Sequence, residues 1–387
     1  VHKRNPSQNR QTQERGNGVP VDITGSDCRS AVLRPPWITD TPPPKIAARP
    51  VARLAFAPIP NLTMNISQRL LALFTSTCLL AALLSAQPAE TKSAPAGRGK
   101  GKAAKEGERP RDQTPSWRMP PVQGANLHYK TFDSKLAGEK VSYLLYLPPG
   151  YETSGNKRYP VVYWLHGIGG GQQGVPQMAE RMTKAIEEQK MPATIFVYVN
   201  GMIRSSYVDS ADGKTPVESV SIKELIPHVD ATYRTIATRA GRMIEGFSMG
   251  GAGAAKWGFK FPDVFGSISI IDGALSTSAE PDARKMDSMK TVYGGDVERY
   301  KASNPVVLAP KNAAKVKGRT AIRIVTRTAG LANANEKFSE LLTQLGLEHE
   351  FYKIPDAPHS PDPLYEGLGE RNWPFYAKAF KAALGPK

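Results

Sequence analysis

A five-residue pattern in the middle of the chain, Gly246-Phe-Ser-Met-Gly250, restricts the fold more than any other feature of this sequence. It fits Gly-x-Ser-x-Gly, in which a strand turns sharply into a helix and presents a serine at the tip of the turn. The serine is strained there, and the residues two before and two after it approach so closely that a β-carbon would clash, which explains both glycines. Apolar Met243-Ile244 precedes the pattern, and a stretch rich in small residues, 250–261, follows it. The sequence therefore predicts a strand, a tight turn at Ser248 and a helix.

The patterns on either side of this turn alternate between strands and helices. Several strands, such as 159–165, are continuous apolar runs, which suit a sheet buried on both faces. Segment 273–310 is charged and irregular, as an insertion over a site would be. The sequence predicts one α/β domain over residues 122–387, with a mostly parallel central sheet flanked by helices on both faces. The expected strands cover 126–133, 140–147, 159–165, 193–200, 243–244, 264–272, 321–326 and 349–354, and the expected helices cover 176–190, 217–233, 250–261, 335–345 and 373–384.

The first 121 residues have a different character. In residues 64–86, Arg69 precedes an apolar run that ends in small residues and is followed by Gln87-Pro88, a pattern typical of a secretory signal peptide. The alternative is a membrane anchor, but the run is short and contains Thr75-Ser-Thr77. We therefore expect a secreted or periplasmic protein, with no stable membrane insertion after cleavage near Ala86.

The signal peptide changes how the ends and the charge are interpreted. Met64 would be a natural start, so residues 1–63 are interpreted as a doubtful N-terminal extension and 87–121 as a basic flexible linker. The formal charge of +16 falls to +10 for a chain that begins at Gln87. No aromatic residues interleave the charges of its segment 91–111, which argues against a nucleic-acid partner. Both cysteines, Cys28 and Cys78, precede Gln87, so no cysteine metal site or thiolate nucleophile is expected.

A glycine-rich loop, His166-Gly-Ile-Gly-Gly-Gly171, follows the expected strand 159–165. Such a loop lets main-chain N–H groups converge on a bound oxygen. We predict an oxyanion hole formed by the N–H groups of Gly167 or Ile168 and of Met249. A phosphate loop is the alternative, but its Gly-Lys-Ser/Thr ending is absent. His166 is interpreted as a structural residue beneath the loop.

A serine hydroxyl needs a base to become a nucleophile, and His359 is the candidate. It lies in a loop after the last expected strand, so the nucleophile precedes the histidine in the chain. Loop 201–216 follows another strand at the edge where α/β sheets bind ligands, which makes Tyr207 and Asp209 candidates for substrate contact. A plain surface loop is the alternative.

Taken together, these motifs resemble the "putative esterase" branch of the α/β-hydrolases, which includes carbohydrate esterase family 1 feruloyl and acetylxylan esterases. The resemblance implies an α/β-hydrolase fold and a serine carboxylic ester hydrolase that works through an acyl-enzyme, with no metal or organic cofactor. It implies a small-molecule or polysaccharide ester as substrate. The residues that carry it are Leu147-Pro-Pro-Gly-Tyr151, Leu165-His-Gly-Ile-Gly-Gly170, Glu224-Leu-Ile-Pro227, Tyr233-Arg-Thr235, Gly246-Phe-Ser-Met-Gly-Gly251 and Pro358-His359.

The chain departs from this family at the expected acid, because Ala329 stands about where the resemblance places an aspartate. We predict Asp272 as the acid instead, since a carboxylate that ends so apolar a strand needs a partner. A loop-bracing role for Asp272 is the alternative. Asp356, Glu336 and Asp362 are weaker candidates for the acid, and a serine–histidine dyad stays open. A second departure is an apparent insertion at 360–372.

Two other functions are compatible with the same scaffold. A catalytically decayed carbohydrate-binding protein would explain the missing aspartate, although Ser248, His359 and the glycines are all retained. A serine peptidase shares the catalytic residues but usually carries a gating domain, for which the residues outside the α/β domain leave no room. The sequence therefore favours an esterase.

Overall fold

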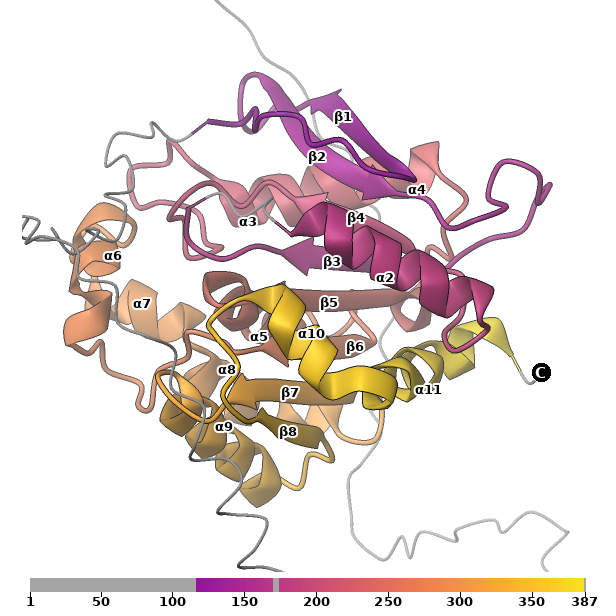
Figure 1. The fold of residues 1–387 in the computed structure, drawn as a ribbon. Helices are drawn as coiled ribbons and strands as arrows, with labels where there is room; N and C mark the ends of the chain where they lie inside the picture. The colour runs from indigo at the N-terminus through magenta and orange to yellow at the C-terminus, as the bar shows by residue number, and fades with distance from the viewer. Residues whose placement is uncertain (1–115, 170–173, 386–387) are drawn as a thin grey trace, which may run out of the picture. The chain divides into compact units, whose positions relative to one another are not determined.

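An eight-stranded sheet crosses the part of the chain that the structure, a computed structural model, describes, residues 116–169 and 174–385. The strand order is β1-β2-β4-β3-β5-β6-β7-β8 (Figure 1). The β1–β2 and β2–β4 pairs are antiparallel, and all other pairs are parallel. The predicted mostly parallel sheet is confirmed. Its strands are β1 (Leu127–Asp133), β2 (Lys140–Tyr146), β3 (Val161–Leu165), β4 (Ile195–Val199), β5 (Arg242–Phe247), β6 (Ser267–Ile271), β7 (Ala321–Arg327) and β8 (Glu350–Ile354).

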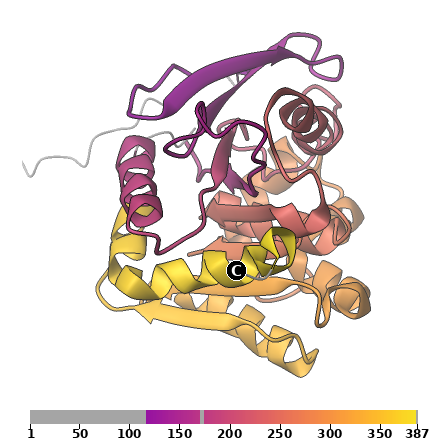
Figure 2. The ribbon, with the colours of Figure 1, turned by 90° about the vertical axis from the view of Figure 1, so that its right-hand side faces the viewer.

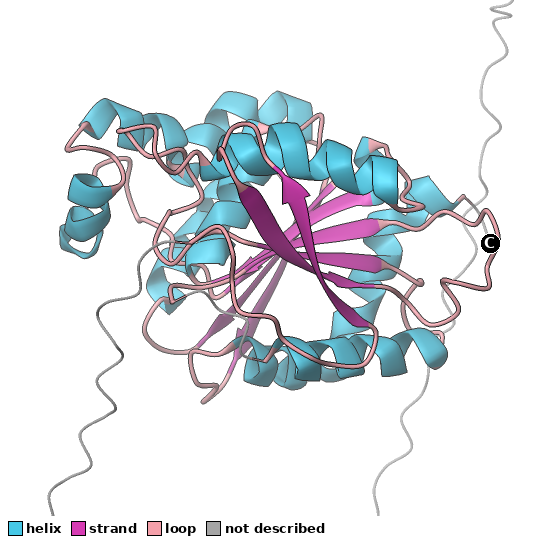
Figure 3. Cartoon of the chain, turned by 90° about the horizontal axis from the view of Figure 1, so that it is seen from above, coloured by secondary structure: helices cyan, strands magenta, loops and turns pink. Residues whose placement is uncertain are grey.

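Helices cover both faces of this sheet, as Figures 1, 2 and 3 show. Successive side chains of a strand point to opposite faces. On β3, Val162 and Trp164 join one apolar cluster, while Val161 and Tyr163 join the other. One face carries α2 (Val175–Glu187), α10 (Pro361–Leu368) and α11 (Trp373–Leu384), and the other carries α3 (Val217–Val220), a π-helical segment (Ser221–Leu225), α4 (Ile226–Thr232), α5 (Met249–Lys260), α8 (Pro305–Val316) and α9 (Ala332–Gln344).

Segment 273–310, expected to be irregular, contains helices, so that expectation is wrong. The helices are α6 (Met286–Thr291), α7 (Val297–Ser303) and the start of α8. Polar side chains define two of the starts: Asp296 accepts the Arg299 N–H at 3.0 Å, and Asn304 accepts the Val306 N–H at 3.1 Å. Such caps satisfy first-turn N–H groups that have no partner within the helix. Short 3-10 turns cover Arg239–Gly241, Ala283–Lys285 and Gly369–Asn372.

The predicted boundary between linker and domain at residue 122 is also wrong. The Ser142 N–H donates to the Trp117 carbonyl at 2.8 Å, and the Met119 N–H donates to Ser142 Oγ at 2.9 Å. Trp117 and Met119 are buried. Trp117 and Met119 therefore belong to the folded domain. The predicted extension (1–63), signal peptide (64–86) and most of the linker lie outside the described residues, as do Gly170 and Gly171.

A buried ion pair joins the sheet to the helices beside it. Glu245 on β5 and Arg323 on β7 lie 2.9 Å apart with fully buried side chains. The Tyr365 hydroxyl of α10 donates to Glu245 at 2.6 Å, and the Tyr376 hydroxyl of α11 also donates to Glu245 at 3.1 Å. Buried charges need such partners, because each alone would be costly to remove from water. Glu245 lies on β5, so this network ties α10 and α11 to the strand that leads into Ser248.

Candidate active site

Ser248 occupies the tight turn between β5 and α5, with φ 57° and ψ −115°. A β-carbon on Gly246 would lie 2.2 Å from the Gly250 carbonyl oxygen, and one on Gly250 would lie 2.0 Å from the Leu165 carbonyl oxygen. The steric reason predicted for both glycines is confirmed. The turn raises the serine above the carboxyl end of β5, where the ends of the neighbouring parallel strands also lie.

Ser248, His359 and Asp272 form a hydrogen-bonded chain at this edge of the sheet. His359 Nε2 lies 2.8 Å from Ser248 Oγ, and its Nδ1 lies 2.6 Å from Asp272 Oδ2. A carboxylate can only accept, so Nδ1 carries the proton and Nε2 is free to accept from the serine hydroxyl. Three residues that follow β5, β6 and β8 are thus brought together in the order that nucleophilic catalysis requires.

The Asp272 carboxylate is fully buried and receives further donors from β7. The Thr326 hydroxyl donates to Oδ1 at 2.7 Å, and Arg327 Nε–H donates to Oδ2 at 3.0 Å. Burial raises the pKa of Asp272, but the hydrogen bonds from His359 and Thr326 and the charge of Arg327 outweigh it and hold the pKa below its usual range. Asp272 is therefore ionised in the folded protein at neutral pH.

The other acid candidates have different partners. Asp356 is exposed, and no hydrogen bond from its side chain to the described residues is found. Asp362 pairs with Arg181 at 2.9 Å, and Glu336 pairs with Lys353 at 2.6 Å. Of the four carboxylates considered, the structure brings Asp272 to His359.

The residues predicted for an oxyanion hole flank the serine. Met249 is the first residue of α5, and first-turn N–H groups have no acceptor within their own helix. The main chain of Gly167 lies against Ser248, since a β-carbon there would be 3.3 Å from Ser248 Cβ. The next residue, Ile168, has a side chain that is 53% exposed. The loop is fixed where the Gly169 N–H donates to the Ile203 carbonyl at 3.1 Å.

His166 supports this loop from below. Its Nε2 accepts the Gly201 N–H at 3.1 Å, so Nδ1 carries the proton and donates to the Gly167 carbonyl at 2.7 Å. Burial lowers the pKa of His166 to about 4, which keeps the ring neutral. The structure therefore places His166 where a structural residue was expected.

The predicted substrate contact for Tyr207 is wrong. Its side chain is fully buried, and its hydroxyl donates to the His166 carbonyl at 3.0 Å. The ring occupies space left by glycines, because a β-carbon would lie 2.2 Å from it at Gly201 and 2.7 Å from it at Gly253. Tyr207 thus holds the loop that carries Gly167.

The Asp209 carboxylate is already engaged within the fold. It accepts the Ser219 N–H at 2.9 Å and the Ser219 hydroxyl at 2.7 Å. These contacts tie loop 201–216 to α3, which is a bracing role rather than the predicted substrate contact.

Sequence reasoning missed several residues around the site. Glu245 and Arg323 interrupt apolar strands, and that interruption is a signal that two buried charges pair. Thr326 and Arg327 end a strand in an ordinary way, and nothing in the sequence marks them as partners of Asp272.

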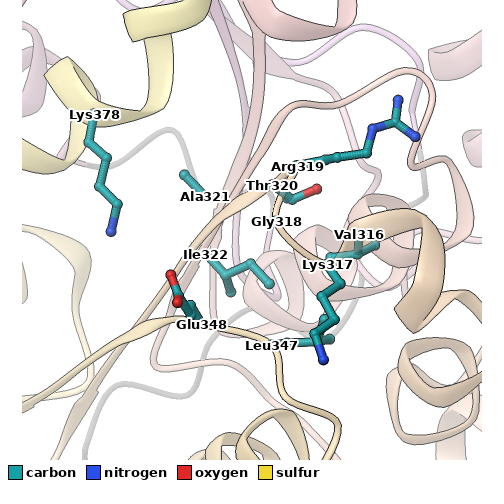
Figure 4. A pocket seen from close by; sticks show the side chains of 10 residues that line it. All are labelled: Val316, Lys317, Gly318, Arg319, Thr320, Ala321, Ile322, Leu347, Glu348 and Lys378. Atoms are coloured by element: carbon teal, nitrogen blue, oxygen red, sulfur yellow. The ribbon is translucent and has the colours of Figure 1, made fainter. Parts of the chain in front are cut away.

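A pocket of about 210 Å³ lies elsewhere, near the amino-terminal end of β7 (Figure 4). Arg327 and Asp272 lie at the opposite end of β7, so this pocket is separate from the serine site. The pocket is lined by Val316, Lys317, Gly318, Arg319, Thr320, Ala321, Ile322, Leu347, Glu348 and Lys378.

Within the described residues, no cluster of His, Cys, Asp and Glu could hold a metal ion. None of the described helices is long and apolar enough to cross a membrane.

The chain is similar in sequence to known esterases. The chain is 31% identical over 253 residues to Esterase Rv1288 of Mycobacterium tuberculosis, covering 59% of this chain and 55% of the relative. It is 29% identical over 200 residues to an endo-1,4-beta-xylanase/feruloyl esterase of Xylanibacter ruminicola, covering 50% of this chain and 28% of the relative. The chain thus spans about half the length of the first relative and less of the second.

Solved structures with the same fold include a ferulic acid esterase, at 22% identity and a TM-score of 0.56, covering 66% of this chain and 98% of that one. An S-formylglutathione hydrolase from Agrobacterium tumefaciens matches at 18% identity and a TM-score of 0.53, covering 66% and 95%. These likenesses confirm the predicted α/β-hydrolase fold.

A family described as "Putative esterase" matches residues 134–385. That range contains the serine turn, the glycine loop, both β6 and β7, and the histidine loop. It covers about two thirds of the sequence. The chain belongs to this esterase family of the α/β-hydrolases.

Proposed function

We propose that this protein is a serine carboxylesterase that hydrolyses its substrate through an acyl-enzyme on Ser248. The observation that carries the proposal is the hydrogen-bonded chain from Ser248 through His359 to Asp272. A buried, ionised carboxylate on one imidazole nitrogen and a strained serine on the other is what acyl transfer needs.

In the proposed reaction His359 removes the proton from Ser248 Oγ as that oxygen attacks the ester carbonyl. The main-chain N–H groups of Met249 and of Gly167 or Ile168 stabilise the oxyanion, each worth about 3–4 kcal/mol in the transition state. His359 then protonates the leaving alcohol. A water, deprotonated by His359, attacks the acyl-enzyme and releases the acid, which regenerates Ser248.

We propose an acylated polysaccharide, carrying feruloyl or acetyl esters, as the substrate class. The support is the name of one relative, an endo-1,4-beta-xylanase/feruloyl esterase, and of one structural neighbour, a ferulic acid esterase. A related small carboxylic ester is the nearest alternative. A decayed carbohydrate-binding protein and a serine peptidase remain the competing functions from other classes.

One substrate panel separates these possibilities. Purified protein would be assayed on p-nitrophenyl acetate, methyl ferulate, acetylated xylan and a peptide amide. We expect hydrolysis of p-nitrophenyl acetate and of at least one of methyl ferulate and acetylated xylan. Cleavage of the amide alone would favour a peptidase, and xylan binding without hydrolysis of any ester would favour a decayed binding protein.

We also propose that the protein is exported and ends up secreted or periplasmic. The support is the basic, apolar and small-residue pattern of residues 64–86. Expression from Met64 in a bacterial host should give an exported product that begins near Gln87, as read by N-terminal sequencing. Recovery of the intact 70–86 segment in membranes would instead indicate an anchor.

A further inference from the structure

A cation lies beside the carboxylate of Asp272. Arg327, the last residue of β7, donates Nε–H to Asp272 Oδ2 at 3.0 Å, and His359 donates Nδ1–H to the same oxygen at 2.6 Å. Since both nitrogens bond to one atom, they lie within about 6 Å of each other. Acyl transfer needs the serine, the histidine and the carboxylate, and it gives this guanidinium no role.

The guanidinium is held in place by the turn that follows it. Gly330 has φ 64°, and a β-carbon there would lie 2.1 Å from Arg327 Nη2 and 2.8 Å from Cζ. A glycine at this position lets the backbone pass close to the guanidinium. The Arg327 side chain is 23% exposed. Its position is therefore set by the fold, unlike that of an arginine extended into solvent.

Other charges around the histidine loop are paired with each other or exposed. On the neighbouring β8, α9, α10 and α2 the partly buried carboxylates form ion pairs, and the loop's own Asp356 is exposed. On the serine side, the Lys285 ammonium donates to the Ala274 carbonyl at 2.6 Å. Arg327 is thus the charged group that directly shares Asp272 with His359. The ion pairs are Lys353–Glu336, Lys378–Glu350 and Arg181–Asp362.

A fixed positive charge at this distance disfavours the protonated, cationic imidazole. The same positive charge also offsets part of the negative charge on Asp272, and that negative charge would otherwise favour the imidazolium. The geometry points to Arg327 as a positioning residue that holds the Asp272 carboxylate against His359 and offsets part of its negative charge. This inference rests on the proposed function, because it takes His359 to be the base.

The test compares Arg327→Met with Arg327→Lys by measuring kcat/KM against pH on one ester. Methionine keeps much of the side-chain volume and removes the charge, so we expect the acidic limb to move to higher pH by about one unit. Lysine keeps the charge, so its acidic limb should stay with that of the wild type. A matched charge control is Arg204→Met, since Arg204 forms an exposed pair with Asp287 at 3.1 Å that solvent screens.

A second readout does not depend on turnover. The ring protons of His359, assigned by their loss in His359→Asn, can be titrated by NMR in the wild type and in Arg327→Met. The midpoint should rise in the variant. A midpoint and an acidic limb that superimpose on the wild type, or a lysine variant that moves as far as the methionine variant, would overturn the inference. If the proposed function is wrong, the wild type will hydrolyse no ester. The NMR midpoints of the wild type and of Arg327→Met would still decide the role of Arg327 in that case.

Discussion

Replacing Ser248 with alanine should lower ester turnover by about a million-fold, because no acyl-enzyme can form without the hydroxyl and the triad acts as a unit. The fold should survive. The serine side chain does not cap α5, and its hydroxyl bonds to the partly exposed His359 rather than to the core. A small residual rate is expected from oxyanion stabilisation and substrate positioning alone.

The measurement is kcat on p-nitrophenyl acetate, with thermal unfolding followed by circular dichroism to check the fold. Ser278→Ala is the matched control, since Ser278 is an exposed serine in the segment after β6. The control should keep the wild-type rate. A Ser248→Ala protein that hydrolyses the ester at the wild-type rate would rule out the acyl-enzyme mechanism.

Replacing Asp272 with asparagine should lower kcat by about ten-thousand-fold. An amide in this position can donate to Nδ1 of His359, which favours the tautomer that has its proton on Nε2 and cannot accept from Ser248. The amide also lacks the negative charge that stabilises the imidazolium in the transition state. The loss should persist at every pH at which the protein is folded, because no protonation of His359 restores a carboxylate.

Asp356→Asn is the matched control for this change. Asp356 has φ 53°, a conformation that asparagine tolerates, and its side chain is exposed. It should keep close to the wild-type kcat across the same pH range. If Asp272→Asn instead keeps full turnover, the enzyme works as a serine–histidine dyad or takes its acid from a residue outside this set.

Local sequence was enough to predict the serine turn. The steric demand that selects glycine at 246 and 250 acts between atoms a few residues apart and against the adjacent strand, so it is visible in the pattern itself. Strands and helices along most of the chain could be predicted for a similar reason, since apolar periodicity records which side of an element is buried. Chain order showed that His359 follows the last strand. Because that strand is parallel to its neighbour, the residues that follow it lie at the carboxyl edge of the sheet.

The helices of segment 273–310 were harder to predict because short helices depend on caps and on packing more than on periodicity. Tyr207 was misjudged for a related reason. A tyrosine in a polar loop, with its hydroxyl group, suggests an exposed side chain. The ring of Tyr207 instead fills the space that Gly201 and Gly253 leave beneath the glycine loop. Cavities of this kind are formed by residues far apart in the chain.

The sequence by itself determined the serine turn, the order of the strands, and the loop that carries the histidine. Only the tertiary structure decided which carboxylate meets that histidine. Asp272 and His359 are 87 residues apart, and their contact depends on how β6, β7 and β8 align in the sheet. The same alignment brings Arg327 to Asp272, a pairing across 55 residues. Periodicity records burial along one element, whereas a contact between loop ends depends on the register of several strands at once, and no local pattern encodes that register.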